Sequence, residues 1–213
     1  MKSLLPIAFA LLGALALPLC AEDAKPLLNA PGKVIAAPDF KQPLGPEWVL
    51  TTGKGTWTPA DGILSVTNIP EQNHIPVLHL TTGPTPLIWE CEFKFNNGKS
   101  FLVGCDAQKH VGRVVIGPKS FKIAEDSTEV KGKVPSHTLS ETPVDLKPDA
   151  WHKLRVEYAG DQIAARLDGQ DIIGQNAYLA TPKVRWWFAA ADTVQIRNVK
   201  ITEGTPIAPA PAK

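Results

Sequence analysis

The sequence predicts an all-β fold, a two-sheet antiparallel jelly-roll sandwich. Three segments in the C-terminal part alternate apolar and polar residues with a period of two: 151–158, 164–169 and 194–201. This period places one face of a strand in a core and the other in water. The Asp168-Gly169 pair between strand-like runs predicts a hairpin turn. Sixteen glycines and twenty prolines among 213 residues favour strands and turns over helices.

The remaining strands follow from the same alternation, from β-branched and aromatic runs, and from the turn residues between them. We expect thirteen strands, at 48–51, 57–58, 63–66, 77–80, 87–95, 100–106, 112–116, 120–125, 151–158, 162–167, 170–173, 184–189 and 194–201. About a dozen strands are typical of a jelly roll rather than of a small barrel.

Residues 1–21 are expected to be a signal peptide and not part of the fold. Lys2 supplies a positive start, 3–20 is almost wholly apolar, and Ala21 offers a small residue at the cleavage point. The protein is therefore expected to be exported, to a periplasm or to the extracellular space. Lipid anchoring at Cys20 is the less favoured alternative, because Leu19 before it is not a small residue.

The mature chain divides into an extended lead-in at 22–38, one jelly-roll domain at 39–203 and a Pro/Ala-rich tail at 204–213. No segment after the signal peptide is apolar for long enough to span a bilayer. A net charge of +1, with the basic residues scattered, argues against nucleic acid as a partner. The oligomeric state is left open.

Two cysteines of the mature chain are candidates for a disulfide. If 87–95 and 100–106 form a hairpin, Cys91 lies opposite Cys105 and both point to the same face as Phe93 and Val103. An oxidising compartment would allow the bridge. The alternative is a pair of buried thiols, since directly opposed strand positions give poor disulfide geometry.

Several short motifs, in their order and spacing, resemble the 3-keto-disaccharide hydrolase domain family of the concanavalin A-like lectin/glucanase superfamily. They are Asp39-Phe40, Trp48, Lys54-Gly-Thr-Trp57, Asp61-Gly-Ile-Leu64, Trp89 to Phe95, Trp151-His152, Leu167-Asp-Gly169 and Arg197 to Ile201. The resemblance covers nearly the whole mature chain. It implies a secreted protein of planctomycete or verrucomicrobial type, whose two-sheet jelly roll holds sugar on its concave face.

The chain departs from that family at positions that matter for catalysis. Better-characterised members carry an Asn-Ser-Gly run leading to an Arg, and then a Gly-x-Glu-x-Gln segment; neither is intact in 96–116. The Glu-x-Asp-x-x-Glu strand of family 16 glycoside hydrolases is also absent, because Glu90-Cys-Glu92 is followed by no third carboxylate.

Glu92 and Glu90 are the sharpest catalytic candidates. Two residues apart on one strand, they face the same side with about 7 Å between their Cα atoms, close to the separation of a glycosidase carboxylate pair. The alternative is an ordinary solvated strand face completed by Lys94.

His110 and Arg113 form the second candidate set. His110 could act as an acid or a base near neutral pH. Arg113 projects away from the Val114 and Ile116 face and could hold sugar hydroxyls or a carboxylate. The alternative is a pair of surface residues at the entry of a strand.

Aromatic residues offer a different route to sugar. Trp186 and Trp187 are neighbours on a strand, so one points inward and the other outward. Trp186 is assigned to the core with Phe188, which leaves Trp187 beside Arg185 as an exposed binding platform. The alternative is that a loop covers Trp187.

No metal site or cofactor is predicted. Five aspartates could supply calcium ligands, Asp39, Asp61, Asp106, Asp168 and Asp171, but none shows the spacing of a calcium loop. Asp168 is better explained by its hairpin turn with Gly169.

Three functions remain in competition. The first is a secreted carbohydrate-active protein that hydrolyses a (3-keto-)glycoside with Glu92 or Glu90, aided by His110 and Arg113. The second is a non-catalytic carbohydrate-binding module that uses Trp187 and Arg113. The third is a structural envelope domain.

Overall fold

The computed structural model describes residues 25–50, 55–69, 71, 74–81, 86–126 and 137–207. The expected signal peptide, Cys20 and the end of the tail lie outside these residues. The described strands are β1 (Asn29–Ala36), β2 (Trp48–Leu50), β3 (Gly55–Ala60), β4 (Ile63–Asn68), β5 (Val77–Leu80), β6 (Leu87–Lys94), β7 (Ser100–Asp106), β8 (His110–Gly117), β9 (Ser120–Glu125), β10 (His137–Pro143), β11 (His152–Ala159), β12 (Gln162–Leu167), β13 (Gln170–Gln175), β14 (Arg185–Ala191) and β15 (Val194–Pro206). One 3-10 helix, η2 (Ala177–Ala180), precedes β14. Within this described part, no helix is long and apolar enough to cross a membrane.

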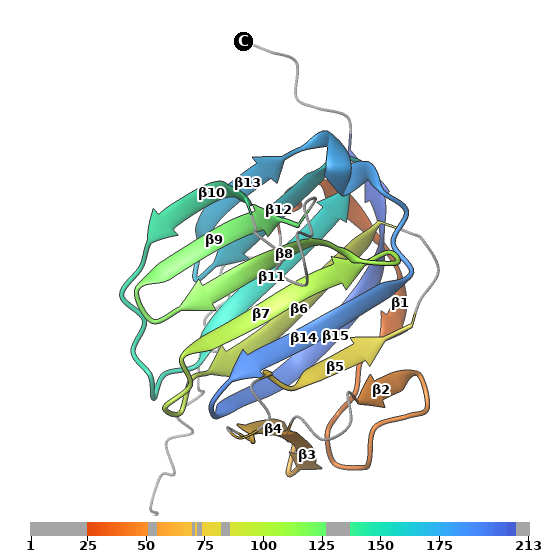
Figure 1. Cartoon of the computed structure of the whole chain (residues 1–213). Coiled ribbons are helices and arrows are strands. Elements are labelled where there is room, and N and C mark those ends of the chain that lie inside the picture. Colours follow the sequence, from red (N-terminus) through yellow and green to blue (C-terminus); the bar gives the residue numbers. More distant parts are fainter. Residues whose placement is uncertain are drawn as a thin grey trace, which may run out of the picture.

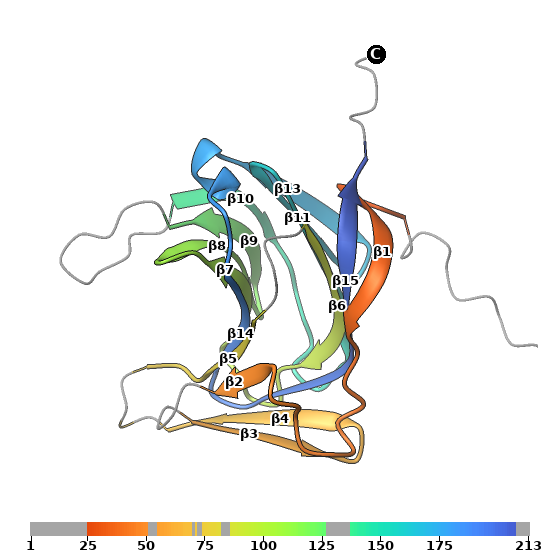
Figure 2. The same cartoon turned by 90° about the vertical axis from the view of Figure 1, so that its right-hand side faces the viewer.

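The strands form two antiparallel sheets that pack face to face. The first sheet has the order β13-β12-β11-β6-β15-β4-β3, with β1 added to the long strand β15. The second sheet has the order β10-β9-β8-β7-β14-β5-β2. Figure 2 shows the two layers edge-on, and Figure 1 views them through the second sheet. The predicted all-β, two-sheet antiparallel jelly roll is confirmed.

All thirteen expected strands are present, most with their ends within a few residues of the prediction. Two further strands were not predicted. In β1, Pro31 and Gly32 interrupt the apolar pattern, yet the strand pairs with β15 from Asn29↔Pro206 to Ala36↔Ile201. Strand β10 is a largely exposed edge strand, so it lacks the alternation that marks a half-buried strand. The first sheet therefore includes parts of the expected lead-in and tail.

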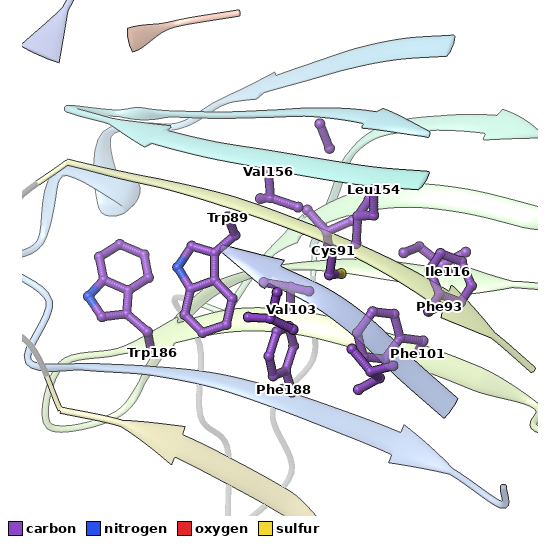
Figure 3. Packing of buried hydrophobic residues seen from close by; sticks show 14 of the residues in the cluster. Trp89, Cys91, Phe93, Phe101, Val103, Ile116, Leu154, Val156, Trp186 and Phe188 are labelled. Atoms are coloured by element: carbon purple, nitrogen blue, oxygen red, sulfur yellow. The ribbon is translucent and has the colours of Figure 1, made fainter. Parts of the chain in front are cut away.

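The core lies between the sheets and is rich in aromatic side chains (Figure 3). Trp89 of the first sheet meets Phe188 of the second edge to face, with ring centroids 4.6 Å apart. Phe93 packs on Phe101 across the same gap at 5.0 Å. Such contacts add to the free energy gained by burying the rings. Inward-pointing residues on both sheets thus fix which residues must point outward.

The predicted hairpin between β6 and β7 is wrong. The chain turns at Asn96 and Asn97, both with positive φ, and crosses from one sheet to the other. Cys91 and Cys105 do both point into the core, as expected, but they are free buried thiols and not a disulfide. Burial raises the pKa of the Cys105 thiol to about 12.

A buried carboxylate anchors the N-terminal segment to the first sheet. Glu157, on β11, accepts hydrogen bonds from the backbone N–H groups of Leu27, Leu28 and Asn29 at 2.7–2.9 Å. Arg155 donates its Nε–H to the same carboxylate at 2.6 Å. Since Glu157 is fully buried, these partners replace the water that its charge would otherwise require.

Asp168 has the hairpin role that the sequence predicted. Asp168 and Gly169 both have positive φ, as the two-residue turn between β12 and β13 requires. The Asp168 carboxylate also accepts from the backbone N–H of Lys153 at 2.8 Å, and one of its oxygens lies 2.7 Å from Nδ1 of His152. The Trp151-His152 and Asp168-Gly169 motifs are therefore one structural unit.

Candidate functional site

Polar residues gather on the outer face of the second sheet, the face turned away from the core. In one row across the sheet, His79, Trp187, Gly104 and Arg113 are register partners on β5, β14, β7 and β8. In the next row, Arg185, Asp106 and His110 lie side by side on β14, β7 and β8. With Asp126, just after β9, these residues form what we call the Asp106 site.

Asp106 is the centre of this site. It is 1% exposed, and its carboxylate accepts from the indole Nε1–H of Trp187 and from His110 Nδ1, both at 2.7 Å. Arg185 donates to the other oxygen at 3.0 Å, and His79 Nε2 lies 4.0 Å away. Burial alone would raise the pKa of Asp106, but these donors outweigh it and the pKa is lowered.

His110 is the group of the site best placed to exchange a proton. An ionised carboxylate can only accept, so Nδ1 carries the proton and Nε2 is left for a ligand. The hydrogen bond to Asp106 raises the pKa of His110 against the opposing effect of burial. Its side chain is 44% exposed. A histidine held by a buried aspartate is the pairing that general acid–base catalysis uses.

Trp187 is buried and is not the exposed platform that the sequence suggested. It is 3% exposed and packs with Leu102 and Ala189 in a small apolar cluster on the outer face. The indole lies over Gly104, where an added Cβ would stand 2.2 Å from Cζ2 of the ring. Gly104 therefore makes room for Trp187, whose role is to hold Asp106 in place.

Arg113 and Asp126 form the far end of the site. Arg113 Nη2 lies 3.0 Å from Asp126 Oδ1, although neither oxygen of Asp126 has an aligned hydrogen bond within the described chain. Burial raises the pKa of Asp126, against the lowering effect of Arg113. The neighbouring Glu125 points to the opposite face, the one that carries Phe121 and Ile123, where it lies 2.5 Å from Nδ1 of His137, so this pair is not part of the Asp106 site.

Glu90 and Glu92 lie elsewhere, on the outer face of the first sheet. They line a shallow groove of about 150 Å³, together with Arg155, Asp168 and Asn198 among others. Arg155 donates to Glu90 at 2.7 Å.

Each carboxylate of the pair is held by its own arginine. Arg197 contacts Glu92 at 2.6 Å, and its guanidinium stacks on Trp151 with 4.0 Å to the ring centroid. Arg197 is thus fixed by its aromatic neighbour as well as by the carboxylate. A positive charge against each carboxylate suits a stable surface network better than a proton donor.

The sequence-derived candidates therefore fall into two sets. Glu90 and Glu92 point out of the first sheet, whereas His110, Arg113 and Arg185 point out of the second. The packed core lies between the sheets, so the two sets cannot act on the same sugar. Sequence reasoning paired them because β6 and β7 are adjacent in the chain.

Sequence reasoning also missed the central role of Asp106. It appeared only among possible calcium ligands, although the alternation of β7 places it outward, two residues after Gly104. The pattern of an outward Gly104 followed by an outward Asp106 is the sequence feature that could have indicated the site. No cluster of three or more potential metal ligands exists among the residues that the structure describes.

No protein-family model matches the chain, and no curated protein matches it significantly. Solved structures do match. Carbohydrate-binding module CBM66 from Bacillus subtilis is similar with a TM-score of 0.59 and 11% identity, over 74% of this chain and 96% of that one. The family 16 endo-β-1,3(4)-glucanase SCLam gives 0.57 and 12%, over 84% and 96%. The endo-β-1,3-glucanase of Pyrococcus furiosus gives 0.56 and 11%, over 82% and 95%. The chain therefore has the concanavalin A-like jelly-roll fold.

Proposed function

We propose that this is an exported carbohydrate-binding protein and that the Asp106 site holds the sugar. The observation that carries the proposal is a buried aspartate that fixes a histidine and an arginine on an open sheet face. Its fold is that of a carbohydrate-binding module and of two glucanases, which supports this class of ligand.

The site offers fixed hydrogen-bond donors to the oxygens of a bound sugar. His110 and Arg185 each use one nitrogen to bind Asp106. Their side chains are 44% and 46% exposed, so their remaining nitrogens can reach a bound molecule. Because both are already held, little side-chain entropy is lost when they bind. The site is thus preorganised without a ligand.

Hydrolysis of a (3-keto-)glycoside is the second candidate, favoured by the His110–Asp106 pair. In this reaction His110 Nε2 would transfer the proton, and Asp106 would orient the His110 imidazole and stabilise its positive charge. The resemblance to 3-keto-disaccharide hydrolases supports the substrate. Glu90 and Glu92 stay candidates for a separate site, although each is paired with an arginine.

A glycan-array screen of the mature protein, with product release followed by mass spectrometry, tests both candidates. We expect binding that is lost in Arg185→Ala and kept in Glu92→Gln, whose residue lies on the opposite sheet. Turnover abolished by His110→Ala would establish the enzyme. Turnover abolished by Glu92→Gln would move the reaction to the first sheet. Silence in both assays would reject the proposal in favour of a structural envelope domain.

A further inference from the structure

The Asp106 site separates its charges by depth. Both of its carboxylates are buried: Asp106 and Asp126 are 1% and 3% exposed. The side chains that reach solvent are a nitrogen base and a cation, with His110 44% and Arg185 46% exposed. A ligand approaching this face therefore meets donors before it meets any acceptor.

This layering is a poor match for a neutral sugar. A sugar hydroxyl both donates and accepts, so a site for neutral sugars needs exposed acceptors beside its donors. Here the carboxylates that could accept from a hydroxyl are already used. Asp106 accepts from three side chains, and Asp126 faces Arg113 at 3.0 Å.

The same layering is a good match for an anion. Arg185 and His110 bind the two different oxygens of the Asp106 carboxylate, which fixes the guanidinium and the imidazole close to each other. Arg113 stands in the neighbouring row, across β7. An arginine fork and an imidazolium are the partners that carboxylate and sulfate groups bind most strongly.

From this geometry we infer that the ligand of the Asp106 site is an acidic sugar, one whose carboxylate or sulfate lies against Arg185 and His110. The inference rests on the proposed carbohydrate-binding function and names its substrate class. Arg185 supplies the fork, His110 the second donor, and Arg113 extends the positive face toward the next sugar unit.

The test is a binding screen of the mature protein against four ligand groups: hexuronate oligosaccharides, their methyl esters, sulfated oligosaccharides and neutral oligosaccharides. We expect binding to the acidic members, loss of binding on esterification, and weakening as NaCl rises from about 50 to about 500 mM. Arg185→Gln should weaken binding about 10- to 100-fold, and Arg185→Lys less. The control Lys119→Gln also removes one positive charge, from an exposed residue that pairs with Asp145 at the β8–β9 turn, and should bind like the parent.

The outcomes separate the two levels of the proposal. Uronates alone or sulfated sugars alone as ligands would each support the inference and identify the acid. Equal binding of esters and neutral sugars would overturn the acidic-sugar inference and leave the carbohydrate proposal intact. Binding of no sugar of any kind would overturn both. Acidic binding that Arg185→Gln does not change would move the site away from Asp106.

Discussion

Replacing Gly104 by alanine would drive a methyl group into the ring of Trp187. The added Cβ would lie 2.2, 2.5 and 2.6 Å from three ring atoms, and the shortest of these is 1.2 Å short of an ordinary contact at 3.4 Å. The indole must therefore move, and it is 3% exposed and bonded to Asp106. Overpacking costs about 1–3 kcal/mol, and the lost bond to a buried charge about 1–3 kcal/mol. We expect the free energy of unfolding to fall by about 2–6 kcal/mol.

Urea denaturation followed by tryptophan fluorescence measures this loss. The control is Gly117→Ala at the end of β8, where the nearest atom to an added Cβ is Ser120 Oγ at 3.4 Å. That variant should change the stability by no more than about 0.5 kcal/mol. If Gly104→Ala is as stable as its control and binds ligand normally, the packing of Trp187 over Gly104 is not what holds the site.

Three further predictions concern buried charges and thiols. Asp106→Asn should lower the pKa of His110 in an NMR titration. The fold raises the pKa of His110 and lowers that of Asp106, so the pair stabilises the protein at pH values between these two pKa values. The stabilisation is lost as the pH rises through the pKa of His110 or falls through the pKa of Asp106. An unchanged His110 titration would refute the pairing. Glu157→Gln should reduce the free energy of unfolding by about 3 kcal/mol and speed amide exchange in the N-terminal segment; parent-like exchange there would show that the carboxylate is not its anchor. In protein lacking residues 1–21, Cys91 and Cys105 should react with a thiol reagent at pH 8 only on unfolding, because burial raises the pKa of both; fast reaction in the native state would contradict their burial.

The fold was predictable because the core imposes a strong local signal. Core residues such as Val66, Phe93 and Ile196 alternate with outward polar neighbours, and that alternation is visible in the sequence of their strands. Strand β1 was not predicted because Asn29 is its only buried residue, so its sequence shows no alternation of apolar and polar residues. Edge strands depend on backbone pairing, which the sequence does not display.

The site was only half predictable, for a topological reason. The sequence identified His110, Arg113 and Arg185 as outward polar residues, because strand alternation fixes direction. It could not tell which sheet each strand joins, so it placed Glu92 in the same site. It also could not foresee that Gly104 lets the outward Trp187 lie flat and become buried.

The most direct test of the Asp106 site is an ¹H–¹⁵N NMR titration of the mature protein with an oligosaccharide that the array identifies. Two indole N–H signals report on opposite sheets: Trp187 is bonded to Asp106, and Trp151 stacks on Arg197 beside Glu92. We predict that the Trp187 signal and the His110 ring shift while Trp151 stays in place. A shift of Trp151 with Trp187 unmoved would contradict this assignment and place the sugar on the first sheet.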